Sequence, residues 1–152
     1  FRSPFPTELF DNDGMQLQKI GKEVGATTGR ARRCGWFDLV AAKYSARLNG
    51  LTSIALTKLD ILDNFETIKV CTHYEYNNKK ITEMSNVLNC LDKVKPVYHS
   101  LPGWNCSLEN IKTFSDLPDK AKDYIKFLSQ ELNTPINIIS IGPQRNQILY
   151  AQ

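Results

Sequence analysis

A helix pattern that leads directly into a short apolar strand pattern is the feature that most constrains the fold of this chain. Residues 115–133, SDLPDKAKDYIKFLSQELN, begin with a Ser-Asp cap signal and carry Pro118 near the first turn, as helix starts often do. Apolar side chains then recur at helical spacing, at Ala121, Tyr124, Ile125, Leu128 and Leu132. The stretch from Ile136 to Ile141 is mostly apolar and runs into a Gly-Pro turn, which predicts a buried strand. The chain is therefore expected to combine helices with a sheet.

The remaining sequence alternates between the same two kinds of pattern. Residues 13–25 and 35–50 predict helices that end at Gly25 and at the Asn49-Gly50 pair. Strands are predicted within LTSIALTKLDIL (51–62), ETIKVCTHYEY (66–76) and VKPVYHSLPGW (94–104). The NNKK stretch, residues 77–80, predicts a hairpin turn. This order of elements predicts a mixed α/β fold.

Composition excludes several classes of protein. The 152 residues are 41% hydrophobic, which is one ordinary domain's worth of chain with enough apolar side chains for a core. A net charge of +3 falls short of the basic excess of a dedicated nucleic-acid domain. The four cysteines form no CxxC pair and only two histidines are present, so no structural metal is expected. No apolar run is long enough to span a membrane. The four cysteines are expected to be free thiols in the cytosol.

The TKLD segment follows an apolar strand pattern and has the composition of a guanine-reading loop. The Asp60 carboxylate can accept two hydrogen bonds, from the ring N–H and the exocyclic amine of guanine, a donor pair that adenine does not present. Lys58 could lay its aliphatic stem along the purine face, and Thr57 could steady the loop. The alternative is that Lys-x-Asp is only a solvated strand end.

A second segment, ISIGPQR, follows the last predicted strand. Backbone N–H groups of Ser140, Ile141 and Gly142 could turn towards a purine carbonyl oxygen there. Ligands of open α/β sheets bind where strands end, so both segments are candidates for one site.

The basic loop GATTGRARRCGW, residues 25–36, is a candidate site for an anion. Its glycines permit close approach of the backbone, Thr27 and Thr28 offer hydroxyls, and an arginine fork matches a carboxylate or a phosphate. A helix starting near Gly35 would add its N-terminal N–H groups to this field. The alternatives are that Arg30, Arg32 and Arg33 pair with surface acids, or that they contact nucleic acid, which ranks last because no aromatic residues are interleaved.

Taken together, these motifs closely resemble one enzyme family. The stretches PFPTEL, GATTGRxRRCGWFD, NGLTSIALTKLD, IKVCTHY, LPGW and IISIGPQR occur in this order and spacing. They resemble the C-terminal third of the adenylosuccinate synthetases, from Pro4 to about Leu149. The resemblance implies an α/β fold that is part of a P-loop NTPase-like, mostly parallel sheet flanked by helices, with a small antiparallel hairpin region. It also implies that residues 1–152 are a single C-terminal region of such an enzyme.

The function that the resemblance implies is a ligase of purine nucleotide biosynthesis. Family members join L-aspartate to inosine monophosphate (IMP) and hydrolyse GTP, with Mg²⁺ required. The matching aspartate loop comprises Ala26, Thr27, Thr28, Gly29, Arg30, Ala31 and Arg32. Arg30 also matches the arginine that binds IMP. The GTP-binding positions match Arg32, Lys58, Leu59, Asp60, Ser140, Ile141 and Gly142.

The family's glycine-rich phosphate-binding segment, with its catalytic and magnesium-binding residues, has no match in these 152 residues. No catalytic residue or metal ligand is therefore assigned to this chain, and the chain by itself is expected to be inactive. The resemblance implies a cytoplasmic homodimer with small-molecule ligands and neither nucleic acid nor membrane as partner. The alternative is a non-catalytic guanine-nucleotide-binding or interaction module derived from the same enzyme.

Overall fold

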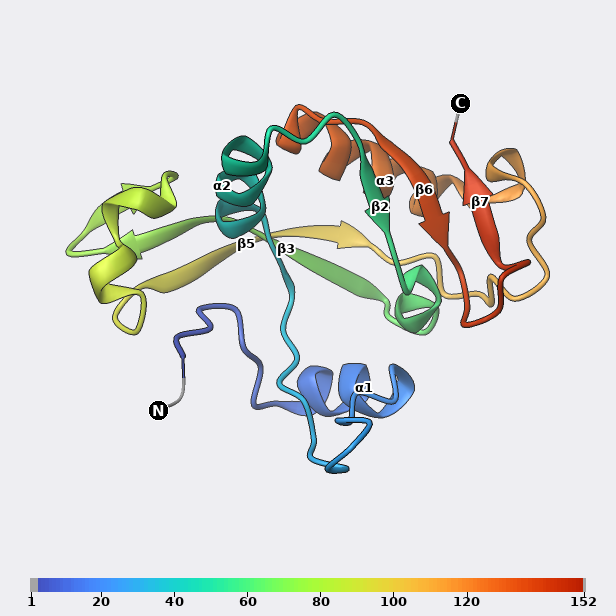
Figure 1. Cartoon of the computed structure of the whole chain (residues 1–152), viewed down its shortest axis with the longest axis horizontal. Coiled ribbons are helices and arrows are strands. Elements are labelled where there is room, and N and C mark those ends of the chain that lie inside the picture. The colour runs from blue at the N-terminus through green and yellow to red at the C-terminus, as the bar shows by residue number, and fades with distance from the viewer. Residues whose placement is uncertain (1–2, 152) are drawn as a thin grey trace. The chain divides into compact units, whose positions relative to one another are not determined.

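A computed structural model describes residues 3–151 of the chain (Figure 1), which divides into two compact units. The first unit comprises Phe1–Ser45 and Lys69–Ser100, and the second comprises Ala46–Ile68 and Leu101–Gln152. The α-helices are α1 (Asn12–Ile20), α2 (Leu39–Asn49) and α3 (Asp119–Leu132). The strands are β1 (Phe37–Asp38), β2 (Ile54–Leu56), β3 (Thr67–Tyr76), β4 (Lys79–Ile81), β5 (Lys95–Pro102), β6 (Ile136–Ser140) and β7 (Ile148–Tyr150). The mixed α/β prediction is confirmed.

The sheet of the first unit is built around β3. Strand β1 pairs with β3 in parallel, β4 pairs with it in the antiparallel direction, and β5 also pairs with it. The turn between β3 and β4 holds Asn77 and Asn78 at φ values of 50° and 60°, the left-handed conformations that a tight hairpin needs. The predicted hairpin is therefore confirmed.

Helix α2 begins at Leu39, four residues later than the sequence pattern indicated. The Asp38 carboxylate accepts hydrogen bonds from the backbone N–H groups of Val40 and Ala41, at 3.0 and 3.2 Å, and so starts the helix. Gly35 instead forms an antiparallel bridge with Glu8. A Cβ atom on Gly35 would collide with the backbone of Thr7, so this close approach requires glycine. The apolar spacing that begins at Phe37 extended the predicted helix too far towards the N-terminus.

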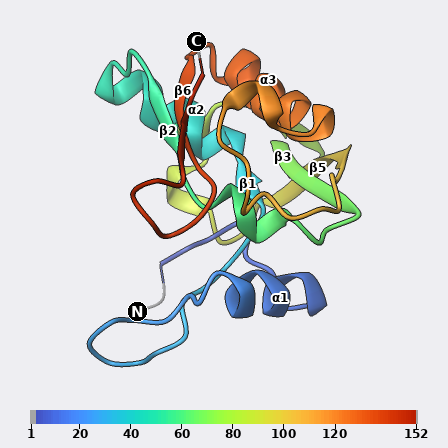
Figure 2. The ribbon, with the colours of Figure 1, turned by 90° about the vertical axis from the view of Figure 1, so that its right-hand side faces the viewer.

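The first predicted helix is shorter than its pattern as well. Helix α1 ends at Ile20, and Gly21 rather than Gly25 is its C-cap, with its N–H bonded to the carbonyl of Leu17. The next residue, Lys22, takes a φ of 48° and redirects the chain. The residues up to Gly25 therefore belong to the loop that follows (Figure 2).

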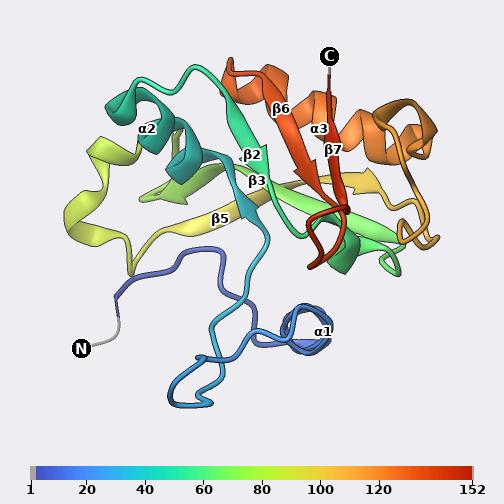
Figure 3. The same ribbon diagram turned by 45° about the vertical axis from the view of Figure 1, so that its right-hand side comes forward.

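The second unit contains a three-stranded sheet in the order β2-β6-β7. Strands β2 and β6 are parallel, and β7, which the sequence analysis missed, is antiparallel to β6. Helix α3 lies along one face of this sheet (Figure 3). Its buried residues are Ala121, Tyr124, Ile125, Leu128 and Leu132, as predicted. Each sheet therefore mixes parallel and antiparallel pairs.

The start of α3 differs from the prediction in one detail. Pro118 occupies the N-cap position, and the residues before it form a separate short 3₁₀ turn, Phe114–Asp116. Asp116 forms a capping box with Thr113 in that turn. The Ser-Asp pair thus lies within the 3₁₀ turn, whose N-cap is Thr113, and does not cap the α-helix.

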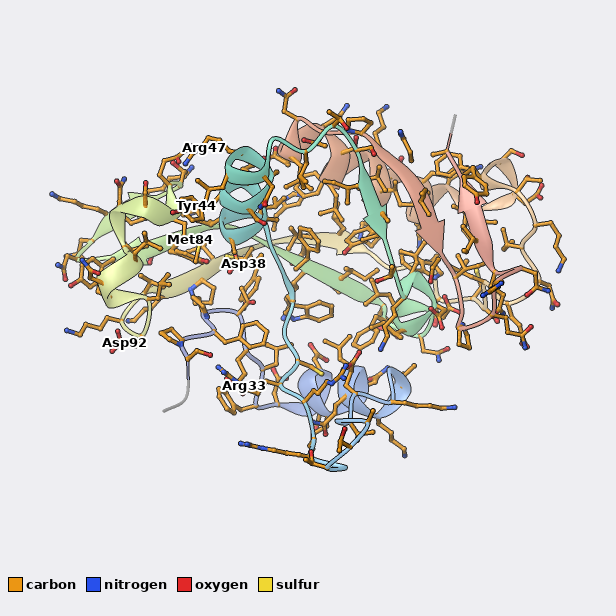
Figure 4. All side chains as sticks on the ribbon, in the orientation of Figure 1. Arg33, Asp38, Tyr44, Arg47, Met84 and Asp92 are labelled. Carbon is orange, nitrogen blue, oxygen red and sulfur yellow. The ribbon has the colours of Figure 1, made fainter. Side chains whose placement is uncertain are left out.

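Asp38, labelled in Figure 4, is expected to make the stability of the first unit depend on pH. Burial raises the pKa of Asp38 above its ordinary value of 3.8, and a 2.6 Å hydrogen bond from the Tyr74 hydroxyl opposes part of that rise. The folded state therefore binds this proton more tightly than the unfolded state. We expect stability to decrease as the pH rises from about 3.8 through the raised pKa, and we expect Asp38→Asn to remove this contribution.

Urea denaturation of the wild type and Asp38→Asn across this pH range tests the expectation. The free energy of unfolding of the wild type, taken relative to the variant, should decrease with increasing pH. Tyr74→Phe removes the bond that lowers the Asp38 pKa, so its pH dependence should extend to higher pH. Parallel pH profiles for the wild type and Asp38→Asn would contradict the assignment.

Candidate functional site

The two segments that follow β2 and β6 meet at one edge of the sheet in the second unit. Leu56 of β2 is in register with Ile139 of parallel β6, so the residues after each strand emerge at the same end. The backbone N–H of Lys58 donates to Ser140 Oγ at 3.4 Å. Ser140 Oγ in turn donates to the carbonyl oxygen of Gly142 at 3.3 Å. The structure thus brings the TKLD and SIG segments together.

The backbone at Lys58 has a conformation that is uncommon outside glycine. Its φ of 60° and ψ of 39° lie in the left-handed region, and the 3₁₀ turn η1 (Leu59–Leu62) starts immediately after it. Leu59 and Leu62 are buried, whereas Thr57 and Lys58 are exposed. The two buried leucines anchor the turn in the core of the second unit.

Asp60 carries an acceptor that lacks a partner. Its Oδ1 atom is buried and bonds no donor among residues 3–151. A buried carboxylate oxygen without a donor costs free energy, and a ligand with N–H groups would satisfy it. The donor edge of guanine is such a ligand.

The second segment has fewer free donors than its sequence suggested. The N–H of Ile141 donates to the carbonyl of Gln147 at 2.9 Å, and the Ile141 side chain is buried. Among the described residues, no acceptor is found for the N–H of Gly142. Gly142 is therefore the residue of this segment that is best placed to donate to a ligand.

The arginine loop lies in the first unit and is closed by backbone hydrogen bonds. Val24 and Ala31 form an antiparallel bridge, and the N–H of Gly25 donates to the carbonyl of Arg30 at 2.8 Å. Residues 26–32, which include the predicted aspartate loop, are exposed along their whole length. The loop therefore presents its threonines and Arg30 to solvent in a closed hairpin.

The three arginines of the loop have different surroundings. Arg33 bonds Glu8 at 2.8 Å and the Ser3 carbonyl at 2.9 Å, and its guanidinium lies 5.1 Å from the centre of the Phe5 ring (Figure 4). Arg32 forms a longer, exposed 3.3 Å contact with Glu23. The Arg30 side chain has no partner among residues 3–151. Arg33 thus stabilises the unit, whereas Arg30 is available to a ligand.

A cavity of about 820 Å³ lies between this loop and α1. Its wall includes Arg30 and Arg32, together with Gln18 of α1. Gln18 Nε2 donates to the Arg32 carbonyl at 2.7 Å, which connects the helix to the loop. A volume of this size is sufficient for a small organic ligand.

The expected contribution of a helix N-terminus to this loop is corrected. The N–H groups of Val40 and Ala41 at the start of α2 are bonded to Asp38 and not directed at a ligand. Positive charge at the loop therefore comes from its arginines.

Sequence reasoning missed Asp63. Its carboxylate accepts from Trp104 Nε1 and from the backbone N–H of Leu108, both at 2.9 Å. The repeated aspartates in TKLDILD, three residues apart, could have indicated two carboxylates on one turn.

Residues 3–151 contain no group of three or more His, Cys, Asp or Glu side chains placed to hold a metal ion. No helix within the same residues is both long enough and apolar enough to cross a membrane.

The fold is a mixed α/β fold in which the segments after two parallel strands, β2 and β6, gather at one edge of a sheet, the place where ligands of open α/β sheets commonly bind. The sequence profile of the adenylosuccinate synthetases matches residues 2–149. The chain belongs to the adenylosuccinate synthetase family.

Relatives and a solved structure agree with this assignment. The chain is 52% identical to the adenylosuccinate synthetase of Geobacter sulfurreducens, over 96% of this chain and 34% of that protein. It is 49% identical to the enzyme of Clostridium kluyveri, over 97% of this chain and 35% of that protein. The fully ligated adenylosuccinate synthetase from Plasmodium falciparum matches 99% of this chain and 37% of its own, with a TM-score of 0.87 and 33% identity. The chain therefore spans about a third of the length of these relatives.

Proposed function

We propose that this chain supplies the aspartate loop and the guanine-binding segments of an adenylosuccinate synthetase, which ligates L-aspartate to IMP with hydrolysis of GTP. One observation carries the guanine part of the proposal. The parallel strands β2 and β6 end beside each other, and a 3.4 Å hydrogen bond joins Lys58 to Ser140. The unpaired Oδ1 atom of Asp60 lies on the same turn and suits a guanine donor.

The arginine loop supports the amino-acid part of the proposal. Thr27, Thr28 and Arg30 are exposed on a closed hairpin, and a guanidinium can bind a carboxylate or a phosphate through two parallel hydrogen bonds. In the proposed reaction Arg30 binds aspartate and IMP, and Arg32 binds GTP after exchanging its exposed contact with Glu23 for the phosphates. These contacts would orient the aspartate amine and neutralise charge on the substrates.

The rest of the proposal follows from family membership. We infer that residues 1–152 are the C-terminal region of the enzyme and that the β2-β6-β7 sheet belongs to a larger, mostly parallel sheet of P-loop NTPase type. GTP is the proposed co-substrate, and Mg²⁺ would neutralise phosphate charge when bound by residues outside this chain. A homodimer in the cytoplasm is the proposed assembly.

Isothermal titration of the chain with GDP and ADP tests the guanine site. We expect selective binding of GDP, weakened by about 100-fold in Asp60→Ala, because each hydrogen bond to a charged acceptor contributes about 1.5–3 kcal/mol. Asp123→Ala, at an exposed position on α3 of the same unit, is the matched control and should bind GDP as the wild type does. Equal affinity for GDP and ADP in the wild type would refute the guanine assignment.

A further inference from the structure

Asp63 holds the turn that carries Asp60 and does not itself need to contact a ligand. The backbone N–H of Asp63 donates to the Asp60 carbonyl at 3.2 Å, so the two residues close the same turn. The Asp63 carboxylate meanwhile accepts hydrogen bonds from Trp104 and Leu108. Asp63 therefore connects the turn to a segment of the chain more than 40 residues away.

A second set of contacts holds the chain just beyond Asp63 against the same segment. The N–H of Gly103 donates to the Glu66 carbonyl at 2.8 Å. A Cβ atom on Gly103 would overlap the carbonyl oxygen of Phe65, so the two backbones touch at a point where only glycine fits. Trp104 is 6% exposed and packs against Tyr124 of α3, with ring centres 6.2 Å apart. The partner of Asp63 is thus itself fixed in the core of the second unit.

We propose that Asp63 is a positioning residue for the guanine site: through Trp104 and Leu108 it holds the turn so that the Asp60 carboxylate can meet both guanine donors. The proposal rests on the proposed function, because it assumes that Asp60 binds guanine. A carboxylate that accepts two hydrogen bonds must have both oxygens aligned with the base, which a loosened turn does not ensure. The lone ring N–H of hypoxanthine needs only one of those bonds.

The selectivity of the wild type for GDP over inosine diphosphate (IDP) therefore measures the position of Asp60. IDP lacks the exocyclic amine, and the wild type should bind GDP about tenfold or more tightly than IDP. In Asp63→Asn an amide NH₂ replaces one carboxylate oxygen and faces one of the two N–H groups, from Trp104 or Leu108, that donate to Asp63. The lost hydrogen bond loosens the turn. Trp104→Phe removes a single donor and keeps a ring in the core, so it is the gentler second variant. Asp123→Asn on α3 is the control.

Titration of the full chain with GDP and IDP distinguishes the outcomes. We expect the GDP to IDP affinity ratio to fall to less than about threefold in Asp63→Asn and Trp104→Phe, and to be unchanged in Asp123→Asn. If both nucleotides weaken by the same factor, Asp63 contributes only to stability, because a smaller folded fraction lowers both affinities equally, and the proposal is overturned. An unchanged ratio in the variants also overturns it. A wild type that does not distinguish GDP from ADP refutes the proposed function itself, and the Asp63 role with it.

Discussion

Asp60→Asn should exchange the base preference of the strand-end site from guanine to xanthine. A carboxylate accepts from the ring N–H and the amine of guanine, whereas an asparagine offers one acceptor and one donor. Xanthine replaces the amine with a carbonyl oxygen, so the asparagine amide can donate where the carboxylate could only accept. We expect the affinity for GDP to fall by about 100-fold and that for xanthosine diphosphate to rise by a similar factor.

Titration of the wild type and variant with both diphosphates measures the exchange. The unpaired Oδ1 atom of Asp60 is the structural reason to expect so large an effect, since no other described residue takes up its hydrogen-bonding capacity. Asp123→Asn provides the same chemical change at an exposed site in the same unit and should leave both affinities unaltered. A uniform loss of both nucleotides in Asp60→Asn would mean that Asp60 maintains the loop without reading the base.

Arg33→Ala should destabilise the protein more than alanine at either of the other two arginines of the basic loop. Arg33 pairs with Glu8, whose side chain is only 9% exposed, and it also bonds Ser3 and covers the Phe5 ring. Removing one partner of a buried ion pair typically costs 3–5 kcal/mol. Because the Arg33 side chain is 29% exposed, we expect a smaller loss, of about 2–4 kcal/mol, in the free energy of unfolding measured with urea.

Arg30→Ala is the matched comparison in the same loop. Its side chain has no partner among residues 3–151, so the free energy of unfolding should change by less than about 0.5 kcal/mol. Arg30→Ala should instead weaken anionic ligands. If the two variants were equally stable, the division of the loop into one stabilising and one ligand-binding arginine would be wrong.

The parts of the fold that the sequence predicted best are those in which local periodicity and tertiary burial agree. All five apolar positions of α3 are buried, and the Asn77-Asn78 hairpin forms where it was expected. Predictions failed where a short polar contact decides the boundary. Asp38 caps α2, which begins four residues beyond Gly35, and a capping signal of this kind is weaker in a sequence than the apolar spacing around it.

Sequence alone determined the motifs of the candidate site, because donors, acceptors and charges are properties of residue types. Lys58, Asp60 and Ser140 could be chosen without coordinates, and parallel strand ends made their meeting expected. Only the tertiary structure decided which groups remain available to a ligand. In the folded protein Arg33 pairs with Glu8, whereas Arg30 is exposed. The Ile141 N–H is bonded to the Gln147 carbonyl, and the Asp63 N–H is bonded to the Asp60 carbonyl in the same turn. The physical reason is that a hydrogen-bonding group pairs with whatever chain folding brings within about 3 Å, and the partners of Arg33 and Ile141 lie 25 and 6 residues away in the sequence.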